Sequence, residues 1–171
     1  TSGLDIGVIG VGGLGHMAVQ FASRMGNHVT AFTTSPDKAE FATRLGASNA
    51  VVIEGDEVPK SMPRPLDILI NTVPQHLDWN AYLNLLDSDG VLTFVGVPAG
   101  PSNIDVTSLI FKRRRIMASP IGGRGMILQM LDAADRFGVE PIIEKFPLKD
   151  ANKAIKKVRD NTIRYRAVLT V

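Results

Sequence analysis

The chain has 171 residues, of which 44% are hydrophobic, and its formal net charge at pH 7 is only +2. This length suits one domain with a sizeable core, and the near balance of charge argues against a protein built to bind nucleic acid. The sequence has no cysteine, which excludes disulfides and thiolate metal ligands. No apolar run is long enough to span a bilayer, so we expect a cytoplasmic protein that binds neither membranes nor nucleic acids.

Short apolar segments alternate with helix-like segments over most of the chain. Strands are expected at residues 4–9, 28–32, 50–53, 66–71, 91–95 and 116–119, which are rich in Val, Ile and Leu. Helices are expected between them, at residues 14–25, 37–45, 79–86 and 107–113. Parallel neighbours need a crossover, and right-handed crossovers place helices on both faces of a sheet. The order therefore predicts an α/β fold with a doubly wound, six-stranded parallel sheet.

The last part of the chain follows a different pattern. Amphipathic helices are expected at residues 126–137 and 151–159, and a terminal strand at residues 164–171. We expect this C-terminal helix and strand to stand apart from the main sheet.

Closely spaced glycines lie between the first expected strand and the first expected helix. Gly10, Gly12 and Gly15 fit G-x-G-x-x-G, and Gly13 adds one more position without a side chain. In this pattern the first glycine allows a tight turn, the second lets a pyrophosphate approach the backbone, and the third lets helix and strand pack closely. The N–H groups and dipole of the following helix would receive the phosphate charge. The strand-to-helix context favours a Rossmann-type dinucleotide site, with a purely structural turn as the alternative.

The second expected strand ends in threonine, where a carboxylate usually binds the adenosine ribose. Thr33 stands there, Thr34 and Ser35 follow, and Lys38 lies one helical turn later. A carboxylate would repel a 2′-phosphate, whereas hydroxyl and ammonium donors would bind one. NADP(H) is therefore favoured over NAD(H), although Thr34 and Ser35 would also suit a role as helix caps, and Asp37 keeps an acid nearby.

Other candidates for chemistry are few. The three histidines, His16, His28 and His76, form no closely spaced cluster with acidic residues, so we expect neither a metal site nor a catalytic residue in this chain. The basic run at residues 112–115 is interpreted as the charged end of a helix before an edge strand, because no aromatic residues are interleaved with it.

A family resemblance covers essentially the whole chain. It is carried by the segments IGVIGVGGLGHMAVQFA, HVTAFTTSPDKAEFATRLGA, LINTV, YLNLLDSDGVLTFVGVP, LIFKRRRIMAS and IGGRGMILQMLDAADRFGVEP. These resemble the coenzyme-binding domain of zinc-containing medium-chain alcohol dehydrogenases, in the branch of the cinnamyl alcohol dehydrogenase-like aldehyde reductases. The resemblance implies a cofactor-binding role for three groups of residues. They are Gly10, Gly12, Gly13, Leu14 and Gly15 at the pyrophosphate; Thr33, Thr34, Ser35 and Lys38 at the 2′-phosphate; and Thr72, Val73, Val95, Gly96, Ser119 and Ile121 around the nicotinamide.

The resemblance also implies a division of labour. Residues 1–146 would form the NADP(H)-binding domain, and residues 147–171 would return to a catalytic domain that this chain lacks. In that family the zinc and its ligands lie mainly in the catalytic domain, so this chain by itself is expected not to reduce aldehydes. The whole enzyme would transfer hydride between NADPH and a small aldehyde or alcohol, as a homodimer joined through the last sheet strand.

Two alternatives and two departures accompany this interpretation. The alternatives are a zinc-free quinone oxidoreductase-like reductase and a non-catalytic dinucleotide-binding module. The departures are Ala118, where the family usually has glycine, and Pro120, which removes a backbone donor beside the expected nicotinamide pocket.

Overall fold

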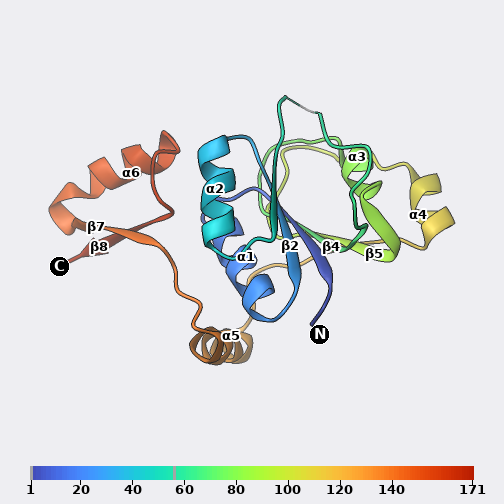
Figure 1. The fold of residues 1–171 in the computed structure, drawn as a ribbon. Coiled ribbons are helices and arrows are strands. Elements are labelled where there is room, and N and C mark those ends of the chain that lie inside the picture. The colour runs from blue at the N-terminus through green and yellow to red at the C-terminus, as the bar shows by residue number, and fades with distance from the viewer. Residues whose placement is uncertain (1, 56) are drawn as a thin grey trace.

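The computed structural model describes residues 2–55 and 57–171 and contains one six-stranded sheet with the order β3-β2-β1-β4-β5-β6. The strands are β1 Asp5–Ile9, β2 His28–Thr33, β3 Asn49–Val52, β4 Leu66–Asn71, β5 Leu86–Phe94 and β6 Arg115–Ala118. All neighbouring strands are parallel. This confirms the Rossmann-type doubly wound sheet (Figure 1).

Helices cover both faces of the sheet, as the crossover argument predicted. The helices α1 Gly15–Arg24 and α2 Pro36–Arg44 pack on a core that includes Val8, Val19 and Val29. The helix α3 Trp79–Leu83 packs on the other core, and α4 Val106–Lys112 joins that core through Leu109. The helix α5 Arg124–Phe137 lies beside α1 (Figure 1). No helix within residues 2–55 and 57–171 has the length and apolar character needed to cross a membrane.

The expected helix at residues 79–86 is wrong at its C-terminal end. It stops at Leu83, and β5 begins at Leu86 rather than at residue 91. Leu86 is fully buried and pairs with Leu66 of β4. The buried Arg114 side chain donates hydrogen bonds to the carbonyls of Asn84 (3.4 Å) and Leu86 (2.7 Å). This contact, made by the residue directly before β6, supports the turn between the helix and the strand and joins segments that are distant in the sequence.

The basic run at residues 112–115 ends a helix and enters an edge strand, as expected. Its side chains make different contacts. Arg113 Nη2 forms an ion pair with Asp89 Oδ2 (2.6 Å), whereas the Arg114 side chain is buried. Arg115 donates to the Asp89 carbonyl. The run therefore forms part of the β5–β6 packing and not a continuous basic surface.

A second, two-stranded parallel sheet forms the C-terminal unit, which we define as residues 143–170. Strand β7 Ile143–Pro147 pairs with β8 Arg166–Thr170, and the crossover between them contains the short 3-10 turn η1 Leu148–Asp150 and the helix α6 Ala151–Arg159. The separate terminal strand was expected, but β7 was missed, because charged residues and flanking prolines interrupt its apolar pattern. The boundary at residue 147 stays a prediction, although residues 143–146 pair with β8.

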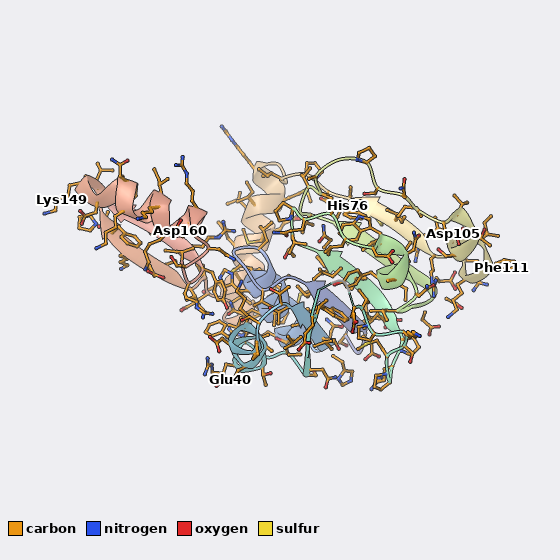
Figure 2. All side chains as sticks on the ribbon, turned by 90° about the horizontal axis from the view of Figure 1, so that it is seen from above. Glu40, His76, Asp105, Phe111, Lys149 and Asp160 are labelled. Carbon is orange, nitrogen blue, oxygen red and sulfur yellow. The ribbon has the colours of Figure 1, made fainter. Side chains whose placement is uncertain are left out.

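The C-terminal unit projects from the side of the main sheet. Figure 2 shows Lys149 at its outer end and Asp160 nearer to the rest of the molecule, both far from His76 and Asp105 at the α3 and α4 side. Its inner end packs on α2, where the Phe41 and Tyr165 rings have centroids 5.1 Å apart. Tyr165 is buried and belongs to the same core as the α1 and α2 face of the sheet.

Candidate functional site

The carboxyl ends of the parallel strands bring the expected site segments to one edge of the sheet. Gly10 follows β1, Thr33 ends β2, Thr72 follows β4, Val95 follows β5 and Ser119 follows β6. The strand order reverses between β1 and β4, which are hydrogen-bonded neighbours. A crevice at such a switch point is the usual ligand position in an open α/β sheet.

The glycine turn has little room for side chains except at one position. A β-carbon at Gly15 would lie 1.8 Å from the carbonyl oxygen of Gly10, and a β-carbon at Gly10 would lie 2.2 Å from Val73 Cγ1. Gly10 also has a φ of +87°, in the left-handed region. A β-carbon at Gly12 would meet no atom within 4 Å. The turn is thus closely packed at Gly10 and Gly15 and open at Gly12, where the second glycine is expected to admit a ligand.

A cation from the C-terminal unit lies beside this turn. A β-carbon at Gly13 would lie 3.3 Å from Cζ of Arg166, the first residue of β8. Leu14 precedes α1 and provides no side-chain cap for the helix. The N-terminus of α1 and the Arg166 guanidinium therefore face one small region, and both attract negative charge. Arg166 was not recognisable from the sequence as a site residue, because only the folded C-terminal unit brings it to the turn.

The buried side chain of Asn71 organises the strand ends of β4 and β5. Its Nδ2 donates to the carbonyl of Val73 (3.1 Å) and to that of Gly96 (3.4 Å), and its Oδ1 accepts from the Val73 N–H (3.1 Å). The Asn71 carbonyl accepts from the N–H groups of Val95 and Gly96. Asn71 was also missed, although a polar residue at the end of an apolar strand is a usable signal.

The Thr72 hydroxyl is directed to the protein backbone. It donates to the Ile9 carbonyl at 2.9 Å, next to the glycine turn. A β-carbon at Gly96 would lie 2.8 Å from the Val73 nitrogen. Thr72, Val73 and Gly96 therefore pack together, and the close packing requires glycine at position 96.

The residues after β2 differ in exposure. Thr33 is only 4% exposed, Thr34 is exposed, and Ser35 and Lys38 are half-buried. The Ser35 hydroxyl accepts a hydrogen bond from the Lys38 N–H (3.3 Å) at the N-terminus of α2. The capping role considered for Ser35 is therefore present in the structure, and Thr34 is the threonine with the more accessible side chain.

The remaining expected site residues form an open wall. Val95 is 37% exposed and Ile121 is 93% exposed. The Ser119 N–H donates to the Phe94 carbonyl (3.1 Å), and its hydroxyl donates to the Pro120 carbonyl (3.2 Å). The N–H contact holds the chain after β6 against the end of β5, two residues before Gly96, and the hydroxyl contact is local.

His16 is fully buried at the start of α1. Its Nδ1 lies 3.0 Å from the Gly12 carbonyl oxygen, and its Nε2 accepts a hydrogen bond from the Ile142 N–H (3.2 Å). Burial, together with the charge of Arg166, lowers the pKa of the imidazole below its ordinary value of 6.5. Because Nε2 is an acceptor, the neutral ring carries its proton on Nδ1 and donates it to Gly12. His28 and His76 are exposed and lie elsewhere.

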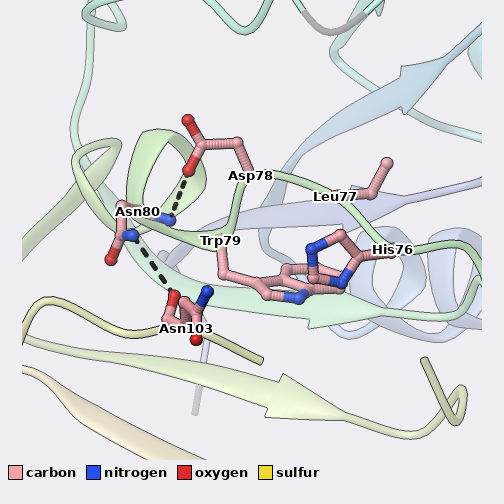
Figure 3. A pocket seen from close by; sticks show the side chains of 6 residues that line it. All are labelled: His76, Leu77, Asp78, Trp79, Asn80 and Asn103. Atoms are coloured by element: carbon pink, nitrogen blue, oxygen red, sulfur yellow. Dashed lines mark hydrogen bonds between the residues drawn. The ribbon is translucent and has the colours of Figure 1, made fainter. Parts of the chain in front are cut away.

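A hollow of about 330 Å³ adjoins the segment after β4, between His76 and Asn103 (Figure 3). Two of its polar side chains, Asp78 and Asn80, are engaged in hydrogen bonds that cap α3 and tie it to Asn103, whereas the buried Trp79 Nε1 has no partner among the described residues. The Asp78 carboxylate caps α3 by accepting from the N–H groups of Asn80 and Ala81, and the Asn80 amide donates to the Asn103 carbonyl (3.2 Å). We interpret the hollow as part of the loop packing and assign it no ligand.

The described residues offer no set of metal ligands. Within residues 2–55 and 57–171, no group of three or more His, Asp or Glu side chains is arranged to hold a metal ion. Zinc therefore does not fit the residues of this part of the chain.

Comparison with known proteins identifies the family. A family model described as zinc-binding dehydrogenase matches residues 13–136. The chain belongs to this family. It is 38% identical over 168 residues to the aldehyde reductase YahK of Escherichia coli, covering 98% of this chain and 48% of that protein. It is also 38% identical over 165 residues to the aldehyde reductase AdhA of Synechocystis, covering 96% of this chain and 49% of that protein.

Solved structures of cinnamyl alcohol dehydrogenases are similar to this member of the zinc-binding dehydrogenase family. The enzyme of Sorghum bicolor matches with a TM-score of 0.85 and 34% identity, over 98% of this chain and 48% of that chain. The enzyme of Helicobacter pylori, complexed with NADP(H), matches with a TM-score of 0.85 and 31% identity, over 99% of this chain and 48% of that chain. The chain thus spans about half the length of the relatives that it matches.

Proposed function

We propose that this chain is the NADP(H)-binding domain of a zinc-dependent alcohol dehydrogenase or aldehyde reductase. The observation that carries the proposal is the glycine turn, which is closely packed at Gly10 and Gly15 and open at Gly12, at the switch point of the sheet. Relatives named aldehyde reductase and NADP-dependent alcohol dehydrogenase support the reaction class. NADP(H) would supply or accept the hydride, and the task of this chain is to hold and orient it.

The pyrophosphate is assigned to the N-terminus of α1. Gly12 and Gly13 offer backbone close to the ligand, and the N–H groups that precede His16 would donate to phosphate oxygens. The N–H groups of His16, Met17 and Ala18 already donate to the carbonyls of Gly12 and Leu14. Arg166 adds a guanidinium on the same side, suited to a bidentate phosphate contact. Two independent sources of positive potential therefore support a phosphate at this turn.

The adenosine 2′-phosphate is assigned to the N-terminus of α2. Thr34, Ser35 and Lys38 supply two hydroxyl groups and an ammonium there, and no carboxylate ends β2. Thr33 is mostly buried, so its contribution is chiefly to leave out the acid that would repel the phosphate. The Ser35 cap is compatible with this role, because a hydroxyl can accept from an N–H and donate to a phosphate.

The nicotinamide is assigned to the wall formed by Val95, Gly96, Ser119 and Ile121. Asn71 joins Gly96 to Val73 of the neighbouring strand end, so the β5 part of the wall is supported by a buried hydrogen-bond network. Pro120 offers no N–H to the carboxamide. In the whole enzyme we expect zinc, bound outside the described residues, to polarise the carbonyl of a small aldehyde.

The proposal is tested by calorimetric titration of NADPH and NADH into the purified chain. We expect NADPH to bind at least about tenfold more tightly, since a charge-assisted hydrogen bond contributes roughly 1.5–3 kcal/mol. Lys38→Ala should weaken NADPH and leave NADH nearly unchanged, and added salt should narrow the difference. Equal affinity for the two cofactors would refute the 2′-phosphate site, and failure to bind either would refute the proposed function.

We also propose that two copies of the chain pair through β6. This strand is the edge of the sheet, and its four residues are exposed. Apolar side chains are exposed beside it on α4, including Ile110 at 68% and Phe111 at 81%. An unprotected edge with apolar neighbours suits a two-fold interface.

A further inference from the structure

A continuous series of hydrogen bonds connects the glycine turn to the backbone of Arg166. His16 Nδ1 donates to the Gly12 carbonyl (3.0 Å), and the Ile142 N–H donates to His16 Nε2 (3.2 Å). The Ile142 carbonyl then accepts from the N–H of Arg166 (3.2 Å). One imidazole ring and Ile142 therefore separate the turn from the start of β8. Ile142 belongs to residues 137–142, from the last residue of α5 to the residue before β7, which we call the connecting segment.

Ring packing supports the same connection. His16 stacks on Tyr165, with centroids 4.9 Å apart and an interplanar angle of 18°. Tyr165 directly precedes Arg166, and its N–H also donates to the Ile142 carbonyl (3.1 Å). Both residues are buried, so the position where β8 begins is defined by packing as well as by hydrogen bonds.

Two other residues of α1 bind the connecting segment without touching the turn. Gln20 Nε2 donates to the Glu140 carbonyl (2.9 Å), and Arg24 Nη1 donates to the Phe137 carbonyl (3.3 Å). His16, Gln20 and Arg24 are four residues apart and lie on one face of the helix. The segment keeps two anchors when His16 is altered, and only His16 also contacts the glycine turn.

We propose that His16 is a positioning residue that holds Arg166 against the glycine turn, so that the guanidinium meets the pyrophosphate of bound NADP(H). This inference rests on the proposed function. The Arg166 side chain is exposed and has many rotamers, so the distance of its guanidinium from the turn depends on where the backbone of Arg166 is held. The imidazole suits the task because its neutral ring offers one donor and one acceptor on opposite sides. It thereby couples a loop near the N-terminus to a strand near the C-terminus.

Two substitutions separate the two hydrogen bonds of His16. In His16→Gln the side-chain oxygen can occupy the place of Nε2 and accept from Ile142. In His16→Asn the shorter amide can still donate to Gly12 but does not reach Ile142. We expect His16→Asn to weaken NADPH binding at least about fivefold, and His16→Gln to retain most of the affinity. Gln20→Met is the matched control, because it removes an equally buried anchor of the same segment and should leave NADPH affinity unchanged.

A coupling measurement distinguishes positioning from general structural damage. Arg166→Ala should weaken NADPH, and adding His16→Asn to it should cause no further loss, because the two residues act through one contact. Binding of 2′-AMP, which has the 2′-phosphate and lacks the pyrophosphate, should be the same in the parent chain and in His16→Asn. Circular dichroism verifies that each variant is folded.

Hydrogen exchange in the unmodified chain provides a measurement that needs no variant. NADPH should slow exchange of the Ile142 amide more than a saturating amount of 2′-AMP does. Equal NADPH affinity of His16→Asn and the parent, additive losses in the double variant, or equal protection of Ile142 by the two ligands would overturn the inference. If the parent chain binds neither NADPH nor 2′-AMP, the proposed function fails instead.

Discussion

The glycine turn leads to a paired prediction in which stability and binding change separately. In Gly15→Ala the new β-carbon would lie 1.8 Å from the Gly10 carbonyl oxygen, so α1 and β1 must move apart. Such overpacking costs about 1–3 kcal/mol, which should lower the Tm by several degrees in a domain of this size. In Gly12→Ala the β-carbon meets no atom within 4 Å, and Gly12 is not among the glycines with positive φ. Its stability should therefore change by less than about 0.5 kcal/mol.

Gly12→Ala should instead weaken cofactor binding, although it leaves stability nearly unchanged. The new β-carbon would enter the space assigned to the pyrophosphate and hold the phosphate away from the backbone. Loss of one charge-assisted hydrogen bond costs roughly 1.5–3 kcal/mol, so the affinity for NADPH should fall at least about tenfold. Thermal unfolding gives the stabilities, and calorimetric titration gives the affinities. A Gly12→Ala variant that binds NADPH like the parent, or a Gly15→Ala variant that is equally stable, would refute this account of the turn.

Two further predictions concern pH and assembly. Burial lowers the pKa of the His16 imidazole, whose ring faces the Arg166 cation and the Tyr165 phenol. As the pH falls, the imidazole is therefore protonated in the unfolded chain before it is protonated in the folded chain. The free energy of unfolding should then fall below about pH 6.5, by at most roughly 1.4 kcal/mol per pH unit. The free energy of unfolding, measured in denaturant from pH 7.5 to 5, should fall less in His16→Gln than in the parent chain. The same pH dependence in both proteins would contradict the role given to His16. For assembly, we expect a dimer in sedimentation experiments and a shift to monomer in Met117→Arg, because Met117 is 55% exposed on the β6 edge and the charge would face its two-fold copy. A parent chain that stays monomeric at high concentration would exclude pairing through β6.

Local signals predicted most of the main sheet. The strand at residues 66–71 has its observed bounds, and β1, β2, β3 and β6 differ from the expected ranges by one residue at one or both ends, because buried parallel strands are recognisable as apolar runs. Strand β5 is the exception, since it begins at Leu86 and not at residue 91. The glycine turn was also predictable, since its packing depends on residues that are close in the sequence. The early end of α3 was not predictable, because Arg114, a residue about 30 positions later and directly before β6, helps to determine it.

In the site too, features that depend on neighbouring residues were predictable and features that depend on distant contacts were not. Sequence alone determined the parallel sheet, the glycine turn and the uncharged end of β2, because apolar periodicity, glycine conformation and side-chain charge are properties of neighbouring residues. Only the tertiary structure decided that β7 pairs with β8, that Arg166 lies beside Gly13, and that His16 joins the two through Ile142. Those contacts bring together opposite ends of the chain. They depend on which surfaces are complementary after the main sheet has formed, and a local pattern of residue types does not show that complementarity.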